Sequence, residues 1–271
     1  MLRNFFRPAG KATPGIQVES EASRPDPEDL ALVAEVAAGI EVDSSEVHDW
    51  FERYREKQQE RLAFDLGLVR RFSTPGDRIV DLGASPPILS GAIAKLGLAI
   101  TGVDIDPSRF SRAFNDLGIE AVACNLETEP LPLDDASAEL VVLHEVFEHL
   151  RIDLIHSLGE VARVLVPGGR LLLSTPNLLS ASGLQNLLLR GRASSCSADP
   201  HKEFSKLRSL GHMGHVREYT TLEVCEFLAH FGLQAEHLVF RGRAKGIKGP
   251  LGRLLPPLRP FFEVVAVKAS V

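Results

Sequence analysis

The feature that most constrains the fold is an alternation of short apolar runs and helical stretches between residues 78 and 175. The runs have the composition of β-strands: RIVDL (78–82), LAITGVD (98–104), EAVAC (120–124), AELVVL (138–143) and GRLLLST (169–175). Helical patterns lie between them, at about 87–97, 107–117 and 152–166. Nearly continuous apolar strands that alternate with helices are typical of a parallel sheet with helices on both faces. Because crossovers between parallel strands are right-handed, the pattern predicts a doubly wound, mostly parallel α/β sheet.

The segments before this alternation have a different character. Residues 1 to about 27 are rich in Pro, Gly, Ser and charge, which predicts a loose leader. A short helix is expected at 27–39, with Pro27 in its first turn, and a longer amphipathic helix runs from Ser44 or Ser45 to Phe72. We therefore divide the chain into a partly flexible leader with a short helix (1–40) and one domain (41–271).

The regular alternation ends at Pro176. A helix is expected at 221–232, with Thr220 or Thr221 as its cap and Glu223 in its first turn. Strands are expected at 234–240 and 261–268, the last of them antiparallel. The remaining segments, 177–218 and 241–260, are interpreted as inserts, and the first of them contains a helical run, LQNLLLRG (184–191), and a polar segment. Long inserts in a compact domain are usually functional or disordered.

Charge is unevenly distributed along the chain. The net charge is −6, whereas 241–260 carries six Lys or Arg and no acid, so the remainder is −12 (−6 minus 6). An acidic body excludes a general nucleic-acid binder. The basic insert 241–260 is either a solvated loop or a contact for a phosphate, an anionic lipid or the membrane periphery.

Compartment signals point to the cytoplasm. The three cysteines, Cys124, Cys196 and Cys225, lack CxxC spacing, which suits free thiols in a reducing compartment. No run of 18 apolar residues predicts a transmembrane helix, and the start MLRNFFRPAGKATPG does not have the pattern of a signal peptide.

The turn after the first strand of the alternation carries the most specific motif, Asp81-Leu82-Gly83-Ala84-Ser85-Pro86-Pro87. Ligands of open α/β sheets bind at the carboxyl ends of strands, and Gly83 allows a tight turn there. Ser85 is predicted to cap the next helix, with Pro86 at its first position. Asp104 follows 21 residues after Gly83, at the spacing of a ribose-binding carboxylate.

The same motif argues against a dinucleotide. A pyrophosphate needs the backbone N–H groups of G-x-G-x-x-G, but Ser85 occupies the second glycine position, and Pro86 and Pro87 have no N–H. Asp81 would also repel a phosphate. A cofactor with a ribose, no phosphate and a cationic centre near Asp81 fits better, and S-adenosylmethionine has these features.

With these motifs, the region from about 78 to 175 resembles the class I S-adenosylmethionine-dependent methyltransferases. Asp81 and Gly83 match the family's acid-x-Gly-x-Gly-x-Gly motif, which the chain leaves at Ser85 and Pro87. The runs EPLPLDDASAELVVLHEVFEHL and EVARVLVPGGRLLLSTPN resemble the family's fourth- and fifth-strand motifs in small-molecule enzymes. The resemblance implies a Rossmann-like fold and the cofactor residues Asp81, Gly83, Ala84, Ser85, Asp104, Ile105, Asn125, Leu126 and His144. Asp104 would bind the ribose, and Asn125 would replace the acid beside the adenine.

Two histidine segments are candidates for the acceptor side. His149 ends the run HEVFEH, and His215 lies in GHMGHVREY, which resembles a segment of methyltransferases from sugar and natural-product pathways. We predict His149 and His215 as general bases, because imidazole titrates near neutrality. The predicted substrate contacts are Glu145, Glu148, His212, Arg217 and Tyr219. The alternative is that these residues are structural.

The leading hypothesis is methyl transfer from S-adenosylmethionine to a small-molecule, sugar or lipid-linked acceptor, at oxygen. His201, His212 and His215 with Glu145 or Glu148 form no tight metal motif, so no metal is predicted. Two alternatives stay open: a methyltransferase-like domain that only binds, and a nicotinamide-dependent oxidoreductase. The sequence does not indicate the oligomeric state or name the acceptor.

Overall fold

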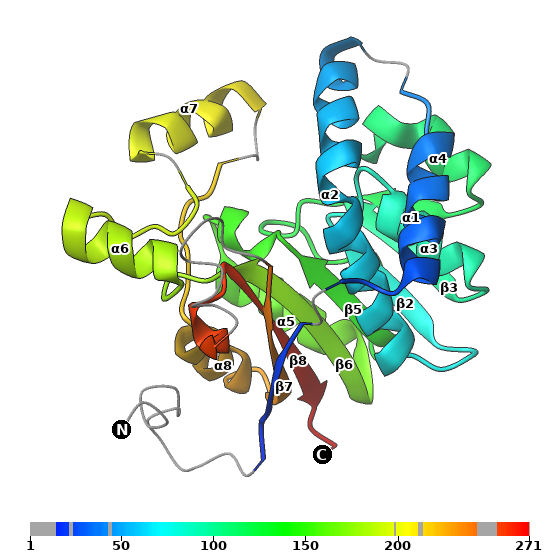
Figure 1. Ribbon diagram of the computed structural model, residues 1–271. Helices are drawn as coiled ribbons and strands as arrows, with labels where there is room; N and C mark the ends of the chain where they lie inside the picture. The colour runs from blue at the N-terminus through cyan, green and yellow to red at the C-terminus, as the bar shows by residue number, and fades with distance from the viewer. Residues whose placement is uncertain are drawn as a thin grey trace. The chain divides into compact units, whose positions relative to one another are not determined.

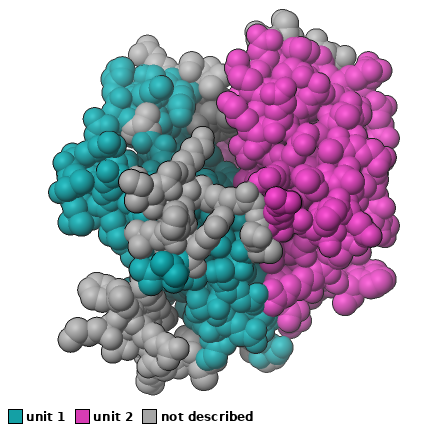
Figure 2. Space-filling model, in the orientation of Figure 1, with its two compact units in different colours: residues 1–21, 143–162, 171–271 teal, residues 22–142, 163–170 magenta. Residues whose placement is uncertain are grey.

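The computed structural model describes residues 15–21, 24–42, 45–197, 199–210, 214–242 and 254–270. The chain divides into two compact units (Figure 2). Unit 1 comprises residues 1–21, 143–162 and 171–271, and unit 2 comprises residues 22–142 and 163–170.

The described strands form an eight-stranded sheet in the order β1-β7-β8-β6-β5-β2-β3-β4 (Figure 1). Their bounds are β1 Gln17–Ser20, β2 Arg78–Leu82, β3 Ala99–Asp104, β4 Glu120–Ala123, β5 Ala138–His144, β6 Leu165–Pro176, β7 Leu233–Arg241 and β8 Phe261–Lys268. β2 pairs in parallel with both β3 and β5, and β3 pairs in parallel with β4. β7 and β8 are antiparallel. The predicted α/β sheet, mostly parallel with an antiparallel last strand, is confirmed.

The helices of unit 2 follow the sequence pattern closely. They are α1 Pro27–Gly39, α2 Ser45–Phe72, α3 Ile88–Lys95, the 3-10 helix η2 Pro107–Phe110 and α4 Ser111–Asp116. Asp26 caps α1 by accepting a hydrogen bond from the Glu28 backbone N–H at 2.8 Å, and Pro27 follows at its first position. One stripe of α2 is buried, including Phe51, Leu62 and Leu66, because its apolar residues recur at helical spacing.

Unit 1 contains helices that the sequence indicated only in part. The elements are η3 Phe147–His149, α6 Ala181–Arg190, α7 Pro200–Leu210, α8 Thr221–Ala229 and η4 Pro256–Leu258, and α5 Leu154–Val164 begins there. α6 and α8 match predicted helical segments. α7 occupies a stretch that was interpreted as an irregular insert, so that insert is partly helical.

Two further expectations need correction. The predicted loose leader contains β1, which pairs in parallel with β7 from Gln17 opposite His237 to Ser20 opposite Phe240. Ser85 does not cap a helix, because α3 begins at Ile88 with Pro87 as its cap residue and no side-chain cap bond. Pro87 has no N–H to bond, so the turn extends two residues beyond the predicted cap.

Tight packing between strand and loop positions the carboxyl ends of β2 and β3. A Cβ atom at Gly102 in β3 would lie 3.0 Å from the Phe114 ring and 3.1 Å from the Ala84 Cβ, so glycine is needed for this approach. The flanking Val103 and its partner on β2, Leu82, are buried. Among the described residues, no helix has both the length and the apolar character needed to cross a membrane.

Candidate active site

The turn after β2 is bonded to the end of β3. Gly83 has φ +83°, a left-handed conformation that glycine adopts without strain. The Gly83 and Ala84 backbone N–H groups donate to the Val103 carbonyl at 2.8 and 3.2 Å, and the Ser85 N–H donates to Asp104 Oδ2 at 3.0 Å. Gly83 and Asp104 therefore lie at one edge of unit 2, as their sequence spacing predicted.

Asp104 is the centre of this arrangement. Besides Ser85, its carboxylate accepts a hydrogen bond from the Asp106 N–H at 2.9 Å, and its side chain is half-buried. Each carboxylate oxygen has two lone pairs, so Asp104 can still accept hydrogen bonds from ligand hydroxyls. The neighbouring Ile105 is 45% exposed, which leaves an apolar surface beside the carboxylate.

Two more polar groups line the turn. Asp81 is buried, and its Oδ2 accepts a 2.6 Å hydrogen bond from the Ser90 hydroxyl. The Ser85 Oγ is buried and has no hydrogen-bond partner among the described residues. A buried hydroxyl without a partner is costly, so this position is suited to a polar ligand group.

Asn125 and Leu126 follow β4 at the same edge. The Cys124 N–H donates to the Asp104 carbonyl at 2.9 Å, which holds the end of β4 beside the end of β3. The Asn125 Oδ1 accepts from the Glu127 N–H at 3.1 Å, so this oxygen shapes its own turn and only the side-chain NH2 is left to donate to a ligand. The structure thus brings together eight predicted cofactor residues: Asp81, Gly83, Ala84, Ser85, Asp104, Ile105, Asn125 and Leu126.

The ninth predicted cofactor residue, His144, lies in unit 1 at the end of β5. Its side chain is 4% exposed, and its Nε2 lies 3.1 Å from Glu263 Oε1. Arg241 pairs with the other Glu263 oxygen at 2.5 Å and with Glu21 at 3.2 Å. His144 therefore belongs to a buried charged network that crosses β5, β8 and β7, which the sequence did not indicate.

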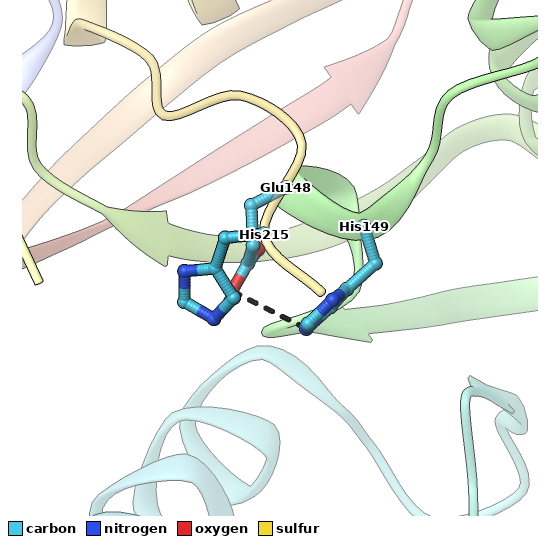
Figure 3. A group of neighbouring side chains, drawn as sticks. All are labelled: Glu148, His149 and His215. Carbon is cyan, nitrogen blue, oxygen red and sulfur yellow. Dashed lines mark ion pairs between the residues drawn. The ribbon is translucent and has the colours of Figure 1, made fainter. Parts of the chain in front are cut away.

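A second group of predicted residues lies in unit 1 around Glu148 in η3 (Figure 3). Glu148 is 1% exposed, and its Oε2 accepts a hydrogen bond from the Thr175 hydroxyl at 3.0 Å. Its other oxygen, Oε1, lies 4.0 Å from the Nε2 of His149 and 4.0 Å from the Nε2 of His215. The two imidazole rings meet edge to face with centroids 4.8 Å apart. The structure therefore joins both predicted bases to one predicted substrate contact.

Both imidazoles are held through their other nitrogen. His149 Nδ1 lies 3.1 Å from the Gly214 carbonyl, which can only accept, so Nδ1 carries the proton. His215 Nδ1 lies 3.8 Å from the Cys196 Sγ, and the His215 backbone N–H donates to Glu203 at 3.1 Å. The Nε2 atoms of both rings therefore face the Glu148 carboxylate.

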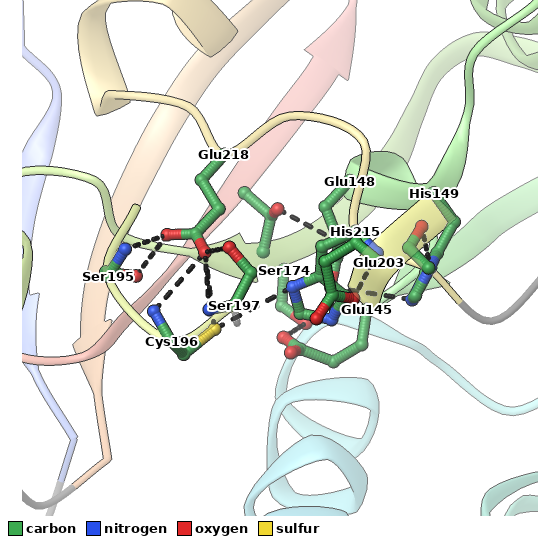
Figure 4. A network of polar contacts seen from close by, with 12 residues as sticks. Glu145, Glu148, His149, Ser174, Ser195, Cys196, Ser197, Glu203, His215 and Glu218 are labelled. Carbon is green, nitrogen blue, oxygen red and sulfur yellow. Dashed lines mark hydrogen bonds and ion pairs between the residues drawn. The ribbon is translucent and has the colours of Figure 1, made fainter. Parts of the chain in front are cut away.

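Glu218 supports this group, although sequence reasoning did not select it (Figure 4). Its buried carboxylate accepts hydrogen bonds from the backbone and hydroxyl of both Ser195 and Ser197. Burial alone would raise the pKa of Glu218, but these hydrogen bonds outweigh it and hold the pKa below its ordinary value. Burial and the nearby Glu218, Glu145 and Glu148 charges raise the pKa of the Cys196 thiol, which stays protonated.

The other predicted substrate contacts have structural partners in unit 1. Glu145 adopts φ +56°, rare for a residue other than glycine, and accepts from the Ser174 hydroxyl at 3.0 Å. Arg217 pairs with Glu223 at 2.6 Å and lies over the ring of Tyr219. Tyr219 is buried against Phe147, and burial raises the pKa of its hydroxyl. His212 lies outside the described residues.

Comparison with known proteins agrees with this geometry. Residues 80–173 match the family model described as methyltransferase domain. This segment of the chain is similar to methyltransferase domains. The chain is 31% identical over 119 residues to a ubiquinone biosynthesis O-methyltransferase of Xylella fastidiosa, covering 41% of this chain and 46% of that protein. It is 33% identical over 100 residues to a demethylmenaquinone methyltransferase of Tropheryma whipplei, covering 36% of this chain and 41% of that protein.

The methyltransferase fold also extends beyond the matched segment. A Burkholderia thailandensis 1,6-didemethyltoxoflavin-N1-methyltransferase, solved with 1,6-didemethyltoxoflavin and S-adenosylhomocysteine, covers 93% of this chain and 94% of its own at a TM-score of 0.54 and 14% identity. By contrast, this chain spans about half the length of the curated relatives that it matches in sequence.

Proposed function

We propose that this chain transfers the methyl group of S-adenosylmethionine to an oxygen atom of a small-molecule acceptor. The observation that carries the proposal is the bonding of the Gly83–Ser85 turn to Asp104, within a segment that matches the methyltransferase domain. The turn also holds the buried, unpartnered Ser85 hydroxyl, and Pro86 and Pro87 offer no N–H to a pyrophosphate. These features support an adenosyl sulfonium over a dinucleotide.

The residues of unit 2 fit the cofactor part by part. Asp104 would accept hydrogen bonds from the ribose hydroxyls, and the exposed Ile105 side chain would cover one face of the adenine. Asn125 would donate to the edge of the adenine, with Leu126 alongside. The negative Asp81 and the turn from Gly83 to Ser85 would hold the cationic methionine portion. The bound cofactor supplies an electrophilic methyl group.

The residues of unit 1 would act on the acceptor. The Nε2 of His149 is free of the proton that Nδ1 carries, so it can take the proton of an acceptor hydroxyl. The deprotonated acceptor oxygen would then be the nucleophile for the methyl group that the bound cofactor would supply. His215 is the second candidate for this base, and Glu148 would stabilise either imidazolium.

The relatives support a class of acceptor. Two are named for ubiquinone and menaquinone pathways, and the structural relative binds a small heterocycle. We propose an acceptor with a ring-borne hydroxyl, including sugar and lipid-linked forms. A cytoplasmic location is part of this proposal and is supported by the three free cysteines, Cys124, Cys196 and Cys225.

We also propose that unit 1 binds to the surface of a membrane. Leu188 and Leu189 on α6 are 78% and 75% exposed, and Leu254, at the end of the basic segment, is 79% exposed. Exposed leucines together with the basic sequence of 241–260 favour binding to an anionic lipid surface. Co-sedimentation with phosphatidylcholine vesicles, with and without phosphatidylglycerol, tests this proposal. Binding that is unchanged by the paired substitution L188E/L189E would contradict it.

Calorimetry with S-adenosylhomocysteine tests the cofactor site. Replacing Asp104 by Asn should weaken binding by about 1–3 kcal/mol, or roughly 5- to 150-fold, because a charged acceptor of ribose hydrogen bonds is lost. D106N is the matched control, because the Asp106 carboxylate bonds Ser108 and Arg109 instead. Equal affinities of D104N and the wild type would contradict the site, and tight NADH binding would favour the oxidoreductase. Tight binding without turnover on any hydroxyl acceptor would favour a binding domain.

A further inference from the structure

The group around Glu148 has the composition of a metal site. Glu148, His149 and His215 each offer one donor atom, and these atoms lie within 4.8 Å of one another. With both Nε2 atoms 4.0 Å from Oε1, the three donors share a point within about 2.5 Å of each, near the roughly 2.0–2.2 Å of zinc–ligand bonds. The three donors would therefore move closer together when an ion binds.

The groups behind the three donors orient them. Histidine ligands of metals usually donate their other ring N–H to a carbonyl or carboxylate, which fixes the tautomer. His149 does this through Nδ1 and the Gly214 carbonyl at 3.1 Å. The Thr175 hydroxyl holds Glu148 Oε2 at 3.0 Å and leaves Oε1 directed at the imidazoles. The His215 backbone is held by Glu203, so all three donors are positioned from outside the triangle.

The charge around the group also favours a cation. Glu148 is 1% exposed, and Glu145, Glu203 and Glu218 lie in the same network of polar contacts (Figure 4). Burying a carboxylate beside other carboxylates is costly unless positive charge accompanies it. A divalent cation would offset the negative charge of these carboxylates.

We propose that Glu148, His149 and His215 bind one divalent first-row transition ion, such as Zn²⁺, Co²⁺ or Mn²⁺. Two imidazole nitrogens and one carboxylate oxygen suit these ions better than Mg²⁺ or Ca²⁺, which prefer oxygen alone. A set of three protein ligands also leaves coordination positions open, as catalytic sites require.

The role of the ion deepens the proposed methyl transfer and rests on it. An acceptor hydroxyl bound to the ion would lose its proton more readily, because the metal lowers the pKa of a bound O–H group. The Nε2 lone pairs of His149 and His215 would then be occupied by the metal. The loaded group would therefore activate the acceptor as a Lewis acid, whereas the group without metal would act as a base.

A neighbouring group, Cys196, His215 and Glu218, is less suited to a metal. The Glu218 carboxylate already accepts hydrogen bonds from Ser195 and Ser197. We therefore assign His215 to the metal site that it forms with Glu148 and His149, and not to the group with Cys196 and Glu218.

Cobalt provides a direct test on the full chain without cofactor or acceptor. Titration of the metal-free protein with Co²⁺ should give a visible absorption band that saturates at one ion per chain. H149A, H215A and the isosteric E148Q should each weaken binding at least tenfold. The matched control is H230A, because His230 is an exposed histidine of unit 1 outside the group. Far-ultraviolet circular dichroism would establish that each variant is folded.

Three results would overturn the proposal. The first is the absence of saturable Co²⁺ binding to the wild type, a result that needs no variant. The second is binding that folded H149A and H215A retain at full strength. The third is a sulfur-to-cobalt charge-transfer band that C196S removes, which would place the ion on Cys196. Co²⁺ binding without methylation of any acceptor would uphold the metal site and contradict the proposed function.

Discussion

At the scale of the residue, the cofactor turn depends on one left-handed glycine. G83A places a Cβ at φ +83°, a conformation that costs an L-residue about 1–2 kcal/mol. Because the same turn would hold the cofactor, the substitution should weaken S-adenosylhomocysteine binding by roughly 5- to 30-fold in calorimetry. G97A is the control, since Gly97 also has positive φ (+78°) but lies in open space after α3. Equal loss of affinity in both variants would show that the effect is not specific to the turn.

The carboxylate of Glu218 predicts a pH-dependent stability. Its pKa in the folded chain lies below its value in the unfolded chain, about 4.3, so the ionised form stabilises the fold above that pH. This contribution is lost as the pH falls through the folded-state pKa. E218Q should therefore unfold at a lower urea concentration than the wild type at pH 7, with a free energy of unfolding lower by about 1–3 kcal/mol. This difference in unfolding free energy between E218Q and the wild type should become smaller below about pH 4. A gap that is constant from pH 7 to pH 3 would contradict this account.

Single residues differ in how far the sequence reveals them. Gly83 and Asp104 were predictable because their spacing is fixed by one strand–helix–strand unit. Glu218 and Glu263 were not, because their partners, such as Ser195 and Arg241, lie more than 20 residues away. Ser85 was misinterpreted as a cap, because a serine followed by proline has the local pattern of a helix start.

At the scale of the element, α8 depends on its capping box. The Thr220 hydroxyl accepts from the Glu223 N–H at 3.2 Å, and the Glu223 carboxylate accepts from the Thr220 N–H at 2.8 Å. T220A should destabilise unit 1 by about 1 kcal/mol, because the Glu223 N–H of the first turn loses its side-chain acceptor. T220S retains the hydroxyl and should stay close to wild type in urea unfolding. If T220A and T220S are equally stable, the cap does not contribute.

The elements that the sequence revealed are those with strong internal patterns. β2 and β8 were predicted at their observed bounds, because each is a nearly continuous run of apolar, β-branched or aromatic residues. β1, with the sequence QVES, has no such run, and it forms because its backbone pairs with β7, far along the chain. α7 has the sequence PHKEFSKLRSL, which contains few apolar residues. The helical periodicity of its apolar residues was therefore too weak to predict a helix.

At the scale of the whole molecule, the chain forms two compact units. The assignment of residues 41–271 to one domain stays a prediction. Strands β5 and β6 each contribute residues to both units, and a local pattern cannot reveal such a division. The predicted cofactor residues other than His144 belong to unit 2, and the predicted bases belong to unit 1. A ligand of unit 2 should therefore act first on the stability of that unit.

Ligand linkage gives a test at this scale. A ligand that binds only the folded chain, at 100 times its dissociation constant, stabilises it by about 2.7 kcal/mol, which corresponds to roughly 5–10 °C in melting temperature for a chain of this size. Saturating S-adenosylhomocysteine should produce this shift in the wild type and in D106N, but a much smaller one in D104N at the same concentration. Hydrogen exchange should slow at 83–85, 104–106 and 125–126, where the backbone would contact the cofactor. Protection confined to residues outside unit 2 would show that the nucleoside binds elsewhere, and the assignment of Asp104 to the ribose would be wrong.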